Sequence, residues 1–136
     1  MKFMLDTNTC IFIMKKNEDV IKQFYIERYA GVCISSITLS ELEYGVEKSN
    51  AVLRNRTNLL AFSTLVDILP FGDSAAQCYG RIRADLEKKG TPIGSLDMLI
   101  AAHAKSRGLI LVTNNTREFQ RVDGLSIVDW VCSSQI

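Results

Sequence analysis

The sequence holds a single histidine, no closely spaced pair of cysteines and no long apolar run. His103 alone cannot supply a histidine metal site and gives little basis for a Ser-His or Cys-His catalytic pair, so a packing role among its alanine neighbours is expected. The four cysteines, Cys132 the last of them, lie far apart, whereas zinc sites and redox motifs need close pairs. Cys10, Cys33 and Cys78 have apolar neighbours and are expected to be reduced, packed side chains.

The chain also lacks features of membrane and secreted proteins. It has no run of about 20 apolar residues that could span a membrane, and its N-terminus lacks the segments of a signal peptide. We therefore expect a cytoplasmic protein without a membrane partner. With 136 residues the chain is long enough to bury its own core, and we expect a single domain over residues 1–136.

Short apolar segments alternate with stretches of helical periodicity. Strands are expected at 2–5, 32–35, 66–69, 109–112 and 126–128. Between the second and third strands, 36–48 and 52–65 have the apolar spacing of two helices, which we interpret as an inserted antiparallel hairpin. Asp73 and Ser95 are expected to cap two later helices. Strands separated by helices predict a three-layer α/β/α domain with a parallel sheet of four or five strands.

Asp6 ends the first strand, and helical periodicity begins directly after it. In an open α/β sheet the ligand crevice lies beyond the carboxyl ends of the strands, so an acid at this position is a candidate site residue. Asp is also a favoured helix N-cap, and this residue alone leaves both interpretations open.

Other polar residues are expected at the same edge of the sheet. Glu41 lies one turn beyond the second strand, although 38–41 (TLSE) is also a capping-box sequence. Asp97 lies in the first turn of a helix, where it either joins the site or stabilises the helix dipole by about 0.3–1 kcal/mol. Thr113 and Asn115 follow the fourth strand.

Parallel strands would bring Asp6, Glu41 and Asp97 to one crevice with the 113–115 turn. Clustered carboxylates repel one another unless protons or cations neutralise them. Because no histidine or thiolate is expected there, the fitting ion is Mg²⁺ or Mn²⁺, which prefer oxygen ligands. Such an ion can activate water for in-line attack on a phosphodiester.

Four segments, in this order and spacing, carry a family resemblance. They read MLDTN at 4–8, ISSIT at 34–38 followed by Glu41 and Tyr44-Gly45, PIG at 92–94 followed by Asp97, and VTNNTREF at 112–119. The chain resembles PIN-domain ribonucleases over nearly its whole length, specifically the VapC-type toxins of type II toxin–antitoxin pairs. The resemblance implies a PIN-like fold and a metal-dependent endoribonuclease that uses Mg²⁺, or Mn²⁺ in its place.

The resemblance also assigns roles to residues. Asp6, Glu41 and Asp97 match the metal-binding and catalytic acids of the family. The family's fourth polar position often carries Asp; here it is Asn115, a neutral ligand, with Glu118 as an alternative. The supporting polar positions of the family fall on Asn8, Ser36 and Thr113.

A homodimer and a cognate antitoxin, whose C-terminal segment covers the groove at the acids, are further implications of the resemblance. The implied substrate is structured RNA, chiefly tRNA cleaved in the anticodon stem-loop, with initiator tRNA as our choice. Cleavage would inhibit translation. Basic residues expected to contact the RNA backbone are Arg81, Arg83, Arg117 and Arg121.

A second interpretation is a catalytically degenerate PIN-like module that binds RNA or a protein. The neutral Asn115 permits it, whereas three intact acids argue against it. A haloacid-dehalogenase-like phosphatase would need an aspartate where Asn8 stands. A receiver-like phosphoacceptor domain would need paired acids after the first strand, which this chain lacks.

Overall fold

An open parallel sheet forms the centre of the molecule. The computed structural model describes residues 1–131, and Cys132 with the rest of the expected polar tail lies outside them. The strands are β1 (Phe3–Leu5), β2 (Val32–Ser35), β3 (Asp67–Leu69), β4 (Ile110–Val112) and β5 (Ile127–Val128). They pair in parallel in the order β3-β2-β1-β4-β5, which confirms the predicted parallel sheet.

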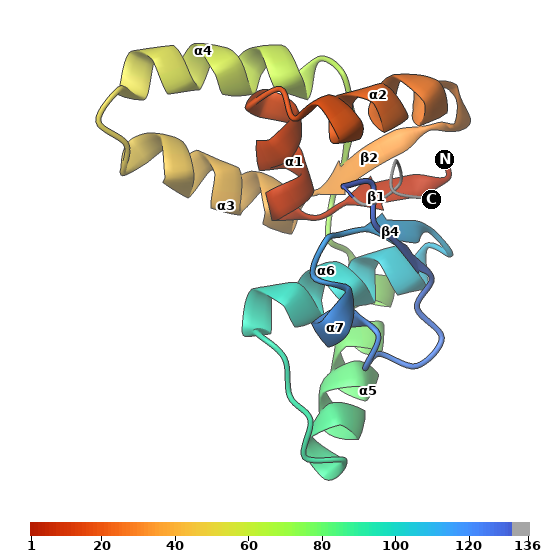
Figure 1. Cartoon of the computed structure of the whole chain (residues 1–136). Coiled ribbons are helices and arrows are strands. Elements are labelled where there is room, and N and C mark those ends of the chain that lie inside the picture. The colour runs from red at the N-terminus through yellow and green to blue at the C-terminus, as the bar shows by residue number, and fades with distance from the viewer. Residues whose placement is uncertain (132–136) are drawn as a thin grey trace.

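Helices cover the sheet on both faces. They are α1 (Thr7–Met14), α2 (Glu18–Glu27), α3 (Ser36–Glu47), α4 (Val52–Ser63), α5 (Asp73–Lys88), α6 (Ser95–Ser106) and α7 (Thr116–Phe119), with a 3₁₀ turn at Arg28–Ala30. Figure 1 shows α1 to α4 on one side of the strands and α5 to α7 on the other. The predicted three-layer α/β/α arrangement is confirmed.

Alternating side chains of the strands feed two hydrophobic cores. In β1, Phe3 and Leu5 belong to the cluster beneath α1 to α4, whereas Met4 belongs to the cluster beneath α5 and α6. In β2, Ile34 and Cys33 divide in the same way. Strands that are buried on both faces are typical of a parallel sheet with helices on each side.

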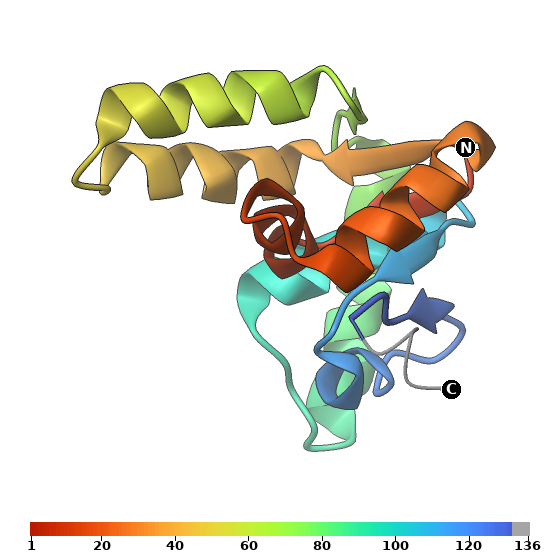
Figure 2. The same cartoon turned by 45° about the horizontal axis from the view of Figure 1, so that its top comes forward.

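The expected helical hairpin is formed by α3 and α4. Figure 2 shows the two helices lying side by side and extending away from β2. Leu42 of α3 and Leu59 of α4 are buried in the same hydrophobic cluster as Leu5 and Ile34 of the sheet. On the outside, Arg56 of α4 forms ion pairs with Glu43 and Glu47 of α3, the second at 2.8 Å. The hairpin is thus joined by packing on one side and by charge on the other.

Two helix starts differ from the prediction by one residue. Asp73 and Ser95 are the first residues of α5 and α6, and the capping positions before them are taken by Gly72 and Gly94. Glycine has no side chain to accept a hydrogen bond, so neither helix start has the predicted side-chain cap.

The topology selects one edge of the sheet for a site. From β1 the chain continues to β2 and β3 on one side, and β4 and β5 are added on the other. In open α/β sheets ligands bind beyond the carboxyl ends of the strands at such a switch point, here between β1 and β4. Among residues 1–131, none of the helices combines the length and the apolar character that crossing a bilayer requires.

Candidate active site

A small hollow of about 150 Å³ opens at the carboxyl edge of the sheet. Its walls come from Asp6 and the first turn of α1, from α3 and α6, and from the segment after β4. The lining residues are Asp6, Thr7, Asn8, Glu41, Asp97, Asn115 and Phe119. The structure therefore brings the three predicted acids to one place, together with two of the predicted polar residues.

Asp6 both caps a helix and lines the hollow. Its Oδ1 accepts a hydrogen bond of 2.8 Å from the backbone N–H of Thr9, which caps α1. The carboxylate is also hydrogen-bonded by the Thr113 side chain. Burial raises the pKa of Asp6 above its ordinary value, against the lowering effect of these hydrogen bonds. The two interpretations that the sequence left open are compatible.

Glu41 does not form the capping box that its sequence suggested. α3 begins at Ser36 and is capped by Ser35, whose Oγ accepts a hydrogen bond of 3.1 Å from the N–H of Ile37. The carboxylate of Glu41 instead accepts a 2.6 Å hydrogen bond from the hydroxyl of Thr7, across the hollow from α3. Glu41 is thereby oriented toward the β1–α1 turn, and the capping interpretation is wrong.

Asp97 lies in the first turn of α6, where a helix dipole alone would lower the pKa of a carboxyl group. Burial and the nearby carboxylates of Asp6, Glu118 and Glu41 instead raise the pKa of Asp97 to about 6. Desolvation and charge repulsion therefore outweigh the dipole at this position. The alternative in which Asp97 only stabilises its helix does not account for this environment.

Of the polar side chains after β4, Asn115 lines the hollow and Thr113 lies buried behind it. The hydroxyl of Thr113, which bonds to Asp6, also accepts a hydrogen bond of 2.9 Å from the N–H of Asn115. The Asn115 amide donates through Nδ2 to Glu118 at 3.1 Å. Because a carboxylate only accepts, this contact leaves the Asn115 carbonyl oxygen as the group able to bind a cation. Asn115 and Glu118, predicted as alternatives, thus form one unit.

The chemistry of this donor set fits a hard divalent cation. Within residues 1–131, no three Asp, Glu, His or Cys side chains are close enough to hold one ion as they stand. The acids share the hollow without surrounding one point. Yet the donors are oxygen atoms, and burial makes the ionised forms of Asp6 and Asp97 costly, which raises both pKa values. Mg²⁺ and Mn²⁺ prefer oxygen ligands and neutralise such charge.

The other predicted polar and basic residues lie at varying distances from the hollow. The Oγ of Ser36 accepts a hydrogen bond of 3.0 Å from the N–H of Phe71 and so orients backbone rather than lining the hollow. Arg121 donates a hydrogen bond of 3.0 Å to the carbonyl of Pro92. This bond holds the loop before α6 against the segment after α7. Arg117 is exposed on α7, two residues beyond Asn115.

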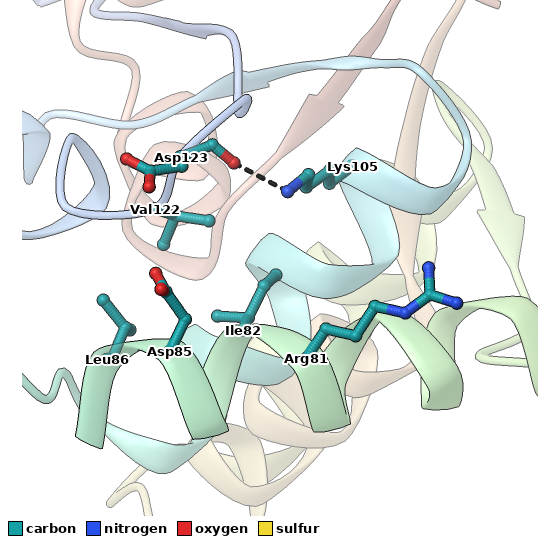
Figure 3. Close-up of a pocket in the computed structure, with 7 residues that line it drawn as sticks. All are labelled: Arg81, Ile82, Asp85, Leu86, Lys105, Val122 and Asp123. Carbon is teal, nitrogen blue, oxygen red and sulfur yellow. Dashed lines mark hydrogen bonds between the residues drawn. The ribbon is translucent and has the colours of Figure 1, made fainter. Parts of the chain in front are cut away.

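Two of the predicted arginines lie on α5, which packs against α6 but contributes no residue to the acidic hollow. Arg83 donates to the hydroxyl of Tyr79 on the same helix at 3.0 Å. Arg81 lines a second hollow, of about 240 Å³, between α5 and the turn after α7 (Figure 3). There Lys105 donates to the carbonyl of Asp123 at 2.7 Å. Among the described residues, the two hollows have no lining residue in common.

Sequence reasoning missed three features of the site. Thr7 and Phe119 were not singled out as site residues, although each stands beside one that was. The third is a buried contact of 2.8 Å between Nδ1 of His103 on α6 and the Oγ of Ser35, the cap of α3. It links the helix that carries Asp97 to the helix that carries Glu41. The two partners are 68 residues apart in the chain, so no local pattern could indicate it.

Comparison with known proteins gives the family. A family model for the PIN domain matches residues 3–125. The tRNA(fMet)-specific endonuclease VapC of Salmonella typhimurium is 50% identical over 130 residues, covering 96% of this chain and 98% of that protein. Ribonuclease VapC2 of Haemophilus influenzae is 44% identical over 131 residues, with coverage of 96% and 99%. The crystal structure of DNA-bound VapBC from Salmonella typhimurium contains a chain that is 50% identical to this one and superposes on it with a TM-score of 0.91. The match covers 96% of this chain and 98% of that chain. The chain belongs to the PIN domain family, among its VapC ribonucleases.

Proposed function

We propose that this chain is a Mg²⁺-dependent endoribonuclease toxin, with Mn²⁺ able to replace Mg²⁺, that cleaves tRNA in the anticodon stem-loop and so inhibits translation. The observation that carries the proposal is the hollow in which Asp6, Glu41 and Asp97 meet. Initiator tRNA is the proposed substrate, in keeping with the name of the Salmonella relative, tRNA(fMet)-specific endonuclease.

In this proposal Asp6, Glu41, Asp97 and the carbonyl of Asn115 hold the ion. When bound, the ion lowers the pKa of water for attack on a phosphodiester and offsets the charge that develops on the phosphate. Thr113 fixes the carboxylate of Asp6. A hollow of about 150 Å³ is small, so the scissile phosphate would reach the acids at its mouth, where Asn8 is exposed as a hydrogen-bond donor.

The proposal includes two protein partners. One is a cognate antitoxin, since the Salmonella relative was solved as a VapBC complex. The family resemblance implies that its C-terminal segment covers the acids. The other is a second copy of this chain, because the family resemblance implies a homodimer. The toxin would act in the cytoplasm, where its RNA substrate is found.

The competing function is binding without cleavage, which the neutral Asn115 would permit. A metal ion separates the two. An ion that binds the folded protein raises its melting temperature by mass action, whereas a degenerate module has no reason to respond.

The deciding experiment is cleavage of purified total tRNA by the protein freed of antitoxin. Mg²⁺, Mn²⁺ and EDTA would be compared for the wild type, Asp6→Asn and Asp97→Asn. Asn is a good N-cap, so Asp6→Asn keeps the start of α1 while removing the charge. Discrete fragments that require both the ion and the two acids support the enzyme. Intact tRNA and ribosomal RNA, with no metal-dependent rise in melting temperature, would favour the binding module.

A further inference from the structure

Gly45 is a glycine that the fold does not require. It lies inside α3, where glycine is less favourable than alanine. Its φ is outside the left-handed region, so its backbone conformation suits any residue. Apart from its own helix, a Cβ added at Gly45 would meet no atom of the described residues within 4 Å. Neither backbone geometry nor internal packing explains the missing side chain.

The preceding residue, Tyr44, exposes an aromatic ring to solvent. Its side chain is 65% exposed, although α3 is otherwise anchored in the core by Leu42 and Val46. The ammonium group of Lys48 lies 5.0 Å from the centre of the ring. An exposed ring with a cation over one of its faces offers both aromatic surface and a positive charge.

These residues share one face of α3 with the candidate catalytic acid. Tyr44, Gly45 and Lys48 follow Glu41 by three, four and seven residues, which are the spacings of neighbours on a helix surface. Glu41 also joins two cavities, because it lines the acidic hollow and a groove of about 300 Å³ between α1, α3 and α4. Gly45 lines that groove. The surface therefore continues directly from the acids.

The charges around this surface suit a polyanion. Glu43 and Glu47, the other acids of α3, are both paired with Arg56 of α4. Lys15 lines the groove, and Lys48 stands at the far end of the helix face. The amide side chains in the groove, Asn55 and Asn58, can donate to and accept from the edge of a base.

We propose that Tyr44 and Gly45 form a subsite for one unpaired base of the RNA substrate, next to the phosphate that is cleaved. The base stacks on the ring of Tyr44, and the sugar–phosphate backbone passes over Gly45, where a side chain would obstruct it. Single-stranded RNA is bound by such stacking on aromatic side chains, with cations along the backbone. The subsite rests on the function proposed above and specifies how that enzyme holds an unpaired stretch of RNA.

The stacking role is tested by Tyr44→Ala and Tyr44→Phe, measured as KM and kcat for tRNA cleavage with Mg²⁺ and as Kd for tRNA in EDTA. Loss of one stacked base weakens binding by roughly 10- to 100-fold, so KM and Kd rise by that factor for Tyr44→Ala while kcat is retained. Tyr44→Phe keeps the ring and stays near the wild type. Tyr29→Ala is the matched control, because Tyr29 is 86% exposed with Arg28 4.8 Å from its ring centre.

The backbone role is tested by Gly45→Ala, with Gly80→Ala as its control. Gly80 lies inside α5, and a Cβ there would likewise meet no atom of residues 1–131 outside its own helix within 4 Å. Both substitutions are expected to raise the melting temperature by about 3 °C through helix propensity. Only Gly45→Ala is expected to raise KM and Kd. A variant that is more stable yet binds RNA less tightly cannot owe the loss to misfolding.

The outcomes separate the subsite from the enzyme. Wild-type KM and Kd for Tyr44→Ala, or equal effects of Gly45→Ala and Gly80→Ala, would overturn the subsite and leave the nuclease intact. Wild-type protein that binds tRNA without cleaving it would refute the enzyme, while Kd still tests the subsite. Protein that neither binds nor cleaves RNA refutes both. Variants that cleave normally but escape inhibition by the antitoxin would assign this surface to a protein partner instead.

Discussion

Replacing Asp97 by Asn is expected to stabilise the metal-free protein and to remove most of its response to Mg²⁺. Asn has nearly the shape of Asp but carries no charge. The substitution therefore relieves the repulsion within the hollow without opening a cavity. A residue that destabilises its own fold in this way is typical of a functional site.

The size of the effect follows from the pKa of Asp97. Burial and three neighbouring carboxylates raise this pKa from 3.8 to about 6. At about 1.36 kcal/mol per pKa unit, the upper limit is about 3 kcal/mol. Since Asp97 is partly exposed to solvent, screening reduces the expected gain to about 1–2 kcal/mol.

The pH dependence of stability shows in which direction Asp97→Asn changes the free energy of unfolding. Because the pKa of folded Asp97 is raised, its favourable contribution to stability is complete below 3.8 and is lost as pH rises through about 6. The metal-free wild type should therefore lose stability across this window, and Asp97→Asn should lose less, because only the raised pKa of Asp6 then contributes. At about pH 8 the variant should melt about 3–8 °C higher than the wild type, and at about pH 4 the two should agree.

Thermal unfolding in metal-free buffer at several pH values measures this directly. Asp19→Asn serves as the control, because Asp19 also lies in the first turn of a helix, α2, but away from the hollow. Losing a helix-dipole partner should lower its melting temperature slightly. If Asp97→Asn also melts below the wild type at about pH 8, the dipole dominates at Asp97 and the reasoning is refuted.

Three further predictions follow from the same contacts. Mg²⁺ at about 100 times its Kd should stabilise the wild type by about 2.7 kcal/mol in thermal unfolding, and an equal rise for Asp97→Asn would place the ion elsewhere. Ser35→Ala should lower the free energy of unfolding, measured with denaturant, by about 1–3 kcal/mol, because both the cap of α3 and the partner of His103 are lost. An unchanged free energy of unfolding would show that water replaces the hydroxyl. Arg117→Ala should weaken tRNA binding and reduce its salt dependence, whereas Arg83→Ala should change neither. A similar loss of tRNA affinity in both variants would extend the RNA-binding surface to α5.

The fold was predictable because its signals are local. Apolar strand segments bounded by helical periodicity predict a covered parallel sheet, and that pattern alone places Asp6 and the 113–115 turn at one edge. The convergence of the acids on that edge followed from strand direction. The exact first residues of α5 and α6 could not be predicted, because Gly72 and Gly94 occupy the capping positions without any side-chain signal.

Details that depend on distant contacts could not be predicted. The 38–41 segment has the local form of a capping box, but the pairing of Ser35 with Leu69 fixes the end of β2, and α3 begins directly after it. Glu41 then becomes free to bond to Thr7. In the same way, composition indicated a set of basic residues, whereas only the packing of α5 against α6 shows that Arg81 and Arg83 lie on a helix that does not line the acidic hollow.

The hairpin of α3 and α4 determines how firmly the three acids are spaced. Asp6 follows the central strand, and Asp97 stands on a helix packed against the sheet, whereas Glu41 is carried by an arm that extends beyond it (Figure 2). The stiffness of that arm depends on buried side chains near its base, such as Phe62 in the last turn of α4. A looser base would let Glu41 drift relative to the other two acids while every residue of the hollow stays intact. The precision of the site is therefore set partly in the hydrophobic core, away from the acids.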